Sequence, residues 1–130
     1  MNKHLVVIDT NVLVSALLSK SGNPAKILDK FLEGGLTFVY CDEILEEYED
    51  VLYRAKLKIP TEEANSLIAD ILLHGIEVWP MPNFTPLPDE DDRCFYNTAI
   101  TAGAYLVTGN AKHYPIEPFV LSPSAYLALH

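Results

Sequence analysis

The apolar residues of this chain alternate between short uninterrupted runs and longer stretches with helical spacing. The first run, Leu5-Val6-Val7-Ile8, has no polar alternation and therefore predicts a strand buried on both faces. Similar runs follow at 36–40, 76–79, 104–108 and 118–121, separated by segments with helical periodicity. This order predicts an α/β fold, a three-layer α/β/α sandwich with a mostly parallel central sheet of about five strands.

Turn residues mark the ends of the predicted helices. Pro24 suits a helix start, Gly34-Gly35 suits a helix end, and Thr61 is a candidate N-cap. Four prolines in the segment 80–88 exclude regular structure and predict a loop. The sequence has no internal repeat and no low-complexity tract, so residues 1–130 are predicted to form a single domain.

Asp9 directly follows the first predicted strand. In open parallel sheets, binding and catalytic sites form at the carboxyl ends of the strands, which makes Asp9 a candidate site residue. The alternative is that Asp9 caps the helix that follows, a position that aspartate often occupies. The sequence leaves both interpretations open.

A second candidate acid comes from the helix predicted over 42–54. Each residue turns a helix by about 100°, which places Glu47 at the border of the apolar stripe and Glu46 on the opposite face. Glu43 is a weaker candidate one turn earlier. The alternative is that these acids form a solvated flank, because the segment contains many charged residues.

A third candidate lies in the acidic stretch Asp89-Glu90-Asp91-Asp92, at the start of the helix predicted over 89–103. Asp92 is in phase with the buried positions Phe95 and Ala99, and Asp89 is nearly in phase. The helix dipole favours acids in a first turn and accounts for Glu90 and Asp91. It does not require a carboxylate on the inward face, which is unfavourable unless something pairs with it.

Three segments that are distant in sequence are therefore predicted to place Asp9, Glu47 and Asp92 at one end of the sheet. Asp89 is an additional candidate metal ligand there. Crowded carboxylates repel one another unless a cation lies between them, and oxygen ligands suit Mg²⁺ or Mn²⁺. A metal held in this way suits phosphodiester hydrolysis.

The composition limits the ways in which the chain can bind a polyanion. The chain has 18 acidic and 9 basic residues and a net charge of −9. It therefore lacks the excess of basic residues expected of a protein that binds nucleic acid through the phosphates alone. No apolar run approaches the roughly 20 residues of a membrane span, so we expect no membrane association and a cytoplasmic location. Cys41 and Cys94 lack the spacing of a metal site or a CxxC motif.

Four motifs in order resemble the PIN-domain nucleases: 6–13, Glu47, 89–96 and the segment 106–114. The last two are similar to the toxin component of bacterial toxin–antitoxin pairs. The resemblance implies a PIN-like fold, a metal-dependent endoribonuclease with an RNA substrate, and a cognate antitoxin partner. A homodimer or larger homo-oligomer is predicted with this assignment. Thr10 and Asn11 resemble residues that support the site.

One position departs from the family pattern. The family's fourth acid follows Thr-Gly at the end of the fourth strand, where this chain has Asn110. A carboxamide ligates metal weakly and carries no charge, which leaves a second metal site in question. Arg93, Lys112 and His113 are weaker candidates for contact with RNA phosphates.

Two other classes of function are compatible with parts of the sequence. A phosphoryl-aspartate receiver or phosphatase-like domain also places an aspartate after a strand, but such phosphatases carry a second aspartate where this chain has Asn11. The second class is a catalytically weak or inactive PIN-like binding module. The replacement of the family's fourth acid by Asn110 is the feature that favours it.

Overall fold

The computed structural model describes residues 4–129. Its five strands form one sheet in the order β3-β2-β1-β4-β5, and every neighbouring pair is parallel. The predicted α/β sandwich around a parallel sheet is therefore confirmed. The strands are β1 (Leu5–Ile8), β2 (Thr37–Tyr40), β3 (Ile76–Glu77), β4 (Tyr105–Val107) and β5 (Val120–Leu121).

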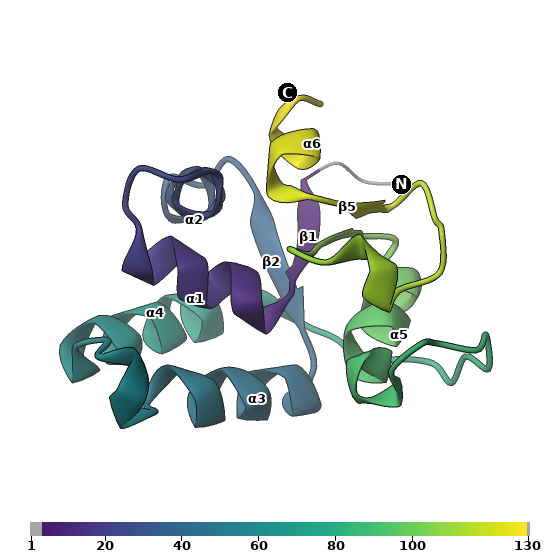
Figure 1. Ribbon diagram of the computed structural model, residues 1–130, viewed down its shortest axis with the longest axis horizontal. Coiled ribbons are helices and arrows are strands. Elements are labelled where there is room, and N and C mark those ends of the chain that lie inside the picture. The colour runs from purple at the N-terminus through teal and green to yellow at the C-terminus, as the bar shows by residue number, and fades with distance from the viewer. Residues whose placement is uncertain (1–3, 130) are drawn as a thin grey trace.

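Helices cover the sheet on both sides. Figure 1 shows α1 and α2 on one side of the strands and α5 on the other, where α5 packs against β1, β2 and β4. The main helices are α1 (Thr10–Leu18), α2 (Asn23–Leu32), α3 (Asp42–Leu52), α4 (Thr61–His74), α5 (Arg93–Ala102) and α6 (Pro123–Leu127). Among residues 4–129, no helix has the length and apolar character needed to cross a membrane.

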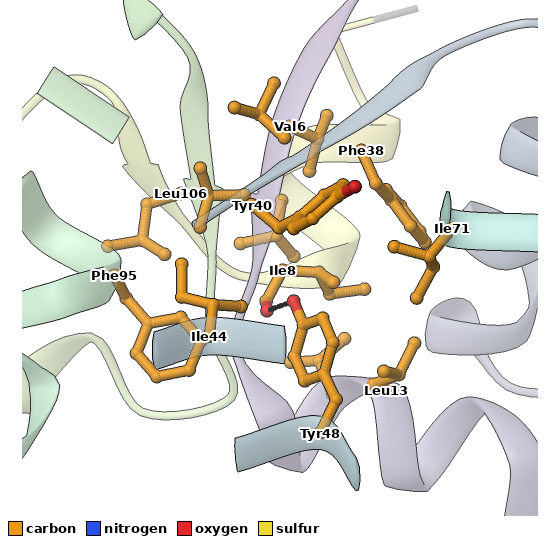
Figure 2. Packing of buried hydrophobic residues seen from close by; sticks show 14 of the residues in the cluster. Val6, Ile8, Leu13, Phe38, Tyr40, Ile44, Tyr48, Ile71, Phe95 and Leu106 are labelled. Atoms are coloured by element: carbon orange, nitrogen blue, oxygen red, sulfur yellow. Dashed lines mark hydrogen bonds between the residues drawn. The ribbon is translucent and has the colours of Figure 1, made fainter. Parts of the chain in front are cut away.

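The central strand β1 sits in the middle of the hydrophobic core. Val6, Val7 and Ile8 are completely buried, as expected for a strand with helices on both faces. Figure 2 shows the side chains of Phe38, Leu106 and Phe95 gathered around this strand. The phenol of the buried Tyr48 on α3 donates a hydrogen bond to the carbonyl of Ile8, which ties α3 to the last residue of β1.

Several elements begin or end elsewhere than the sequence pattern predicts. The strand β1 matches its apolar run, but the other four strands are shorter than theirs, and β3 contains only Ile76–Glu77. Pro60 rather than Thr61 occupies the N-cap of α4. The acidic segment expected to open the helix at Asp89 forms a short 3₁₀ turn, η2 (Glu90–Asp92), before α5 begins at Arg93. The Asp89 side chain accepts a hydrogen bond from the Asp91 amide at 2.9 Å, which stabilises this turn.

Candidate active site

Asp9 lies where β1 ends and α1 begins, at the carboxyl edge of the sheet. Its amide donates to the carbonyl of Val107 at 2.9 Å, which extends the pairing of β1 with β4 by one residue. The side chain is 8% exposed, and its Oδ2 accepts hydrogen bonds from Thr108 Oγ1 at 2.9 Å and from Tyr114 OH at 3.2 Å. Although Asp9 occupies the N-cap position, its carboxylate is directed toward the segment that follows β4.

Glu47 reaches the same region from α3. The buried hydroxyl of Thr10, the residue after Asp9, donates a hydrogen bond to Glu47 Oε2. Burial raises the pKa of the Glu47 carboxyl and the charge of Asp9 adds to this, while the Thr10 hydrogen bond acts in the opposite direction. Glu47 is therefore held next to the end of β1, whereas Glu46 and Glu43 are exposed to solvent.

Asp92 occupies the N-cap position of α5, and its side chain is 16% exposed. Burial and then the charge of Asp9 raise its pKa to about 6, and the neighbouring His113 lowers it. His113 Nδ1 lies 3.4 Å from Asp92 Oδ2. That oxygen is buried and accepts no hydrogen bond from any residue the structure describes.

The three carboxyl groups thus come from the end of β1, from α3 and from the start of α5. The charges of both Asp9 and Glu47 raise the pKa of Asp92, which places all three within electrostatic reach of one another. Such an arrangement favours binding of protons or a cation, because either one relieves the repulsion among the acids.

Comparison with known proteins identifies the family. A family model described as PIN domain matches residues 5–112, a span that contains Asp9, Glu47 and Asp92. This chain belongs to the PIN domain family. It is also 33% identical over 108 residues to an uncharacterized protein of Methanocaldococcus jannaschii, with 81% of this chain and 70% of that protein covered. PIN domains are generally nucleases, and the fold of this chain is of that nuclease-like type.

The other predicted site residues of this PIN domain differ in their exposure and in the contacts that they make. Asp89 is exposed and supports η2, and its charge adds to the raised pKa of Asp92. Asn11 and Lys112 are exposed. Arg93 binds the Glu90 carboxylate through Nε at 3.1 Å and through its terminal nitrogen at 2.8 Å, so its charge is largely compensated. His113 is the one basic candidate in contact with Asp92.

Asn110 lies at the rim of the site and takes part in local structure. Its Oδ1 accepts a hydrogen bond from the Lys112 amide at 3.3 Å and caps the short turn η3 (Ala111–His113). Its backbone amide donates to Thr108 Oγ1 at 3.1 Å, the same hydroxyl that donates to Asp9. Asn110 is exposed, and only its backbone amide is linked to the acids, through Thr108.

Sequence analysis assigned no role to Thr108 and Tyr114, the two donors to Asp9. Both are buried, at 1% and 3% exposure. Burial, together with the charges of Asp9 and Asp92, raises the pKa of the Tyr114 phenol, so Tyr114 remains a protonated donor at neutral pH. The available signal was the position of Thr108, a hydroxyl residue directly after an apolar strand at the same edge as Asp9.

The donor set fits a hard divalent cation held partly by water. Among residues 4–129 no three acidic, histidine or cysteine side chains are arranged to enclose a metal ion together. Magnesium commonly keeps several waters and takes only one or two protein carboxylates, so a pair such as Asp9 and Asp92 suffices. Asp92 Oδ2 is a buried oxygen that accepts no hydrogen bond from the described residues, and His113 Nδ1 lies 3.4 Å from it.

Proposed function

We propose that this PIN domain is an endoribonuclease that depends on Mg²⁺ or Mn²⁺. One observation carries the proposal: three carboxyl groups converge at the carboxyl edge of the sheet, and the pKa values of two of them, Glu47 and Asp92, are raised. Membership of a family whose members are generally nucleases supports the same reaction class. RNA as the substrate rests on the resemblance of the motifs.

In this proposal Asp9 and Asp92 hold the ion, and Glu47 contributes directly or through a water molecule. A divalent ion bound there would supply Lewis-acid chemistry, activating water and offsetting negative charge on the phosphate. Thr108 and Tyr114 fix the direction of the Asp9 carboxylate, and Thr10 does the same for Glu47. His113 lies beside Asp92 and is positioned to donate a hydrogen bond to an oxygen at the rim of the site.

The direct test is cleavage of an end-labelled single-stranded RNA by purified protein. We expect cleavage that stops with a chelator, returns with Mn²⁺, and falls at least about 100-fold in Asp9→Asn and Asp92→Asn, because loss of supporting residues alone commonly costs 10- to 100-fold. Asp91→Asn is the matched control, since Asp91 is the exposed neighbour of Asp92. Cleavage that survives chelation, or that is equal in Asp9→Asn, overturns the proposal.

We also propose that the protein acts as the toxin of a toxin–antitoxin pair. A cavity of about 510 Å³ lies between α1, α2 and α4. Its walls combine apolar side chains such as Leu17 and Leu67 with acids such as Asp29 and Asp70. This chemistry suits an amphipathic helix that carries basic residues, a common mode of peptide recognition.

The partner proposal is tested with the product of a small gene adjacent to this one that encodes a DNA-binding protein. We expect a complex on gel filtration that suppresses cleavage and is lost in Leu32→Glu, which changes a half-exposed residue of the cavity wall. Leu73→Glu is the control, because Leu73 is exposed on α4 and is not part of that wall. Absence of such a gene product, or equal binding by both variants, contradicts the proposal.

A catalytically weak binding module is the alternative that one observation favours. Asn110 brings no charge to the site, and its carboxamide oxygen is already used by the Lys112 amide. Binding of Mn²⁺ and RNA without metal-dependent cleavage would support this alternative.

A further inference from the structure

The proline-rich loop 80–88 and its first neighbour Trp79 present apolar side chains to solvent next to α5. Trp79 is 73% exposed, Met81 is 68% exposed and Phe84 is 89% exposed. Figure 1 shows this loop extending beside α5, away from the rest of the molecule. An exposed aromatic side chain within a constrained loop, as at Phe84, is typical of a binding site rather than of packing.

The loop is fixed to α5 at two points. The Met81 amide donates to Thr101 Oγ1 at 2.8 Å, and Arg93 donates to the Asn83 carbonyl at 2.8 Å. Asn83 also accepts a hydrogen bond from the Thr85 amide at 2.9 Å, which shapes the backbone around Phe84. Together with the prolines, these contacts hold the Phe84 backbone in place before any ligand arrives.

A cavity of about 310 Å³ lies between the loop and α5, and we call it the loop–α5 pocket. It is lined by Pro82, Asn83, Phe84, Glu90, Arg93 and Asn97. The amide oxygen of Asn97 is buried and has no hydrogen-bond partner within residues 4–129. An aromatic ring, a guanidinium group and an amide side chain whose oxygen is shielded from solvent therefore line one concave site.

We propose that the loop–α5 pocket binds one unpaired base of the RNA substrate, stacked on Phe84 and hydrogen-bonded by Asn97. This inference rests on the proposed ribonuclease function and names a substrate-binding residue for it. Single-stranded RNA is recognised mainly by stacking of its bases on aromatic side chains and by hydrogen bonds to their edges. Besides its buried oxygen, the Asn97 amide carries two N–H donors for such an edge.

The charge of the protein favours binding through bases over binding through phosphates. The net charge is −9, and Arg93 in the pocket is already paired with Glu90. Stacking engages the uncharged faces of the bases, so it is compatible with an acidic surface and tolerant of sequence. A pocket of this kind gives an acidic nuclease affinity for RNA that its charges do not supply.

The loop–α5 pocket and Asp92 are both built on the N-terminal part of α5. Arg93 directly follows Asp92 and lies one turn before Asn97 on α5, so Arg93 and Asn97 share a face of the helix. Asp92 instead aligns with the completely buried Phe95, three residues later. The pocket and the acids thus flank the first turn of α5 on different sides.

The experiment measures fluorescence anisotropy of a labelled single-stranded RNA in the Asp9→Asn background, which prevents cleavage. We expect Phe84→Ala to weaken binding roughly 10- to 100-fold, the usual loss for one stacked base. Phe84→Tyr should retain binding, and Asn97→Ala should weaken it less than Phe84→Ala does. The slope of log affinity against log salt concentration should not change, because no phosphate contact is removed.

Trp79→Ala is the matched control, since Trp79 is an exposed aromatic residue outside the pocket wall. An RNA with abasic sites should bind the parent and Phe84→Ala proteins equally weakly. The inference is overturned if Phe84→Ala binds RNA as tightly as the parent, or if Trp79→Ala loses as much RNA affinity as Phe84→Ala. It is also overturned if Phe84→Ala weakens the complex with the antitoxin protein but leaves RNA affinity unchanged. Metal-dependent cleavage that is unchanged in Phe84→Ala overturns the pocket and leaves the proposed function intact. If the parent neither binds nor cleaves RNA, both fail.

Discussion

Asp9 and Asp92 lie at the same edge of the sheet in different surroundings. The Asp9 carboxylate accepts hydrogen bonds from Thr108 and Tyr114, whereas the buried Oδ2 of Asp92 accepts none from the described residues and has His113 Nδ1 at 3.4 Å. Burial and the neighbouring acids raise the pKa of Asp92 to about 6. The difference indicates that the protein itself fixes one carboxylate and leaves the other to be completed by a cation or a proton.

Among changes that leave all three acids in place, the largest effect is expected from removing a donor to Asp9. Tyr114→Phe deletes a buried hydroxyl, so we expect Mn²⁺ affinity and cleavage to fall about 10- to 100-fold. The free energy of unfolding should fall by about 1.5–3 kcal/mol, the usual range for a hydrogen bond to a charged group. Calorimetric titration with Mn²⁺ and urea denaturation provide the two measurements.

Tyr53→Phe is the control for this change, because the Tyr53 hydroxyl bonds to Asn65 in an exposed position. Metal affinity in Tyr114→Phe equal to that of the control would show that Asp9 does not depend on its donors.

Replacing Asp92 is expected to change the free energy of unfolding in the opposite direction. In chelator at neutral pH, Asp92→Asn removes a charge that is disfavoured by burial and by Asp9, so the free energy of unfolding should rise. We expect about 1 kcal/mol, less than the full electrostatic penalty because solvent still reaches the group. The stabilisation that Mn²⁺ gives to the parent protein should shrink in the variant.

Thermal melts with chelator and with Mn²⁺ measure both effects, and Asp91→Asn again serves as the control. A lower melting temperature for Asp92→Asn in chelator would mean that Asp92 stabilises the metal-free fold, and the contrast with Asp9 would be lost.

A smaller effect follows from the pH dependence of stability. The pKa of Asp92 is about 6 in the folded chain against an ordinary 3.8, so the folded state binds more protons than the unfolded state between these values. Its contribution to stability is complete below about pH 4 and is lost as the pH rises through about 6. The raised pKa of Glu47 acts in the same direction.

In chelator, the melting temperature of the parent should therefore decline from pH 5 to pH 7 more than that of Asp92→Asn. Scanning fluorimetry over this range measures the difference. If the melting temperatures of the two proteins change with pH in the same way, a group other than Asp92 is responsible for the pH dependence.

The smallest effect is expected at Asn110. Asn110→Asp retains an acceptor for the Lys112 amide and adds a charge at the rim of the acids. We expect a slightly lower melting temperature in chelator and a larger upward shift with Mn²⁺ than the parent shows. If neither value changes, position 110 does not act on the acid cluster.

The parallel sheet follows from local features that the sequence displays directly. Val6, Val7 and Ile8 form an apolar run without alternation, and the runs around β2 and β4 repeat the pattern. Helical phase was sufficient to distinguish Glu47 from Glu46, because packing of α3 buries one stripe. These properties depend on neighbours within a few residues.

The surroundings of Asp9 and Asp92 depend on contacts that sequence spacing does not encode. Thr108 and Tyr114 donate to Asp9 from 99 and 105 residues away, and the motif at 106–114 that contains them does not show that their hydroxyl groups bond to Asp9. Asp92 was expected inside a helix, yet the bond between Asp89 and the Asp91 amide forms a tight turn and leaves Asp92 as the N-cap of α5. Such competition between short-range hydrogen bonds and helix formation is decided by geometry.

The central position of β1 also bears on how the chain folds during synthesis. β1 pairs with β2 as soon as residue 38 is available, but its other edge waits for β4, where Ile8 pairs with Val107. Contacts of such long sequence separation form late, because closing a long loop costs entropy. A nascent chain that has not yet released β4 has an uncovered strand edge and no donors for Asp9. Assembly of the acid cluster is therefore delayed until nearly the whole described chain has left the ribosome.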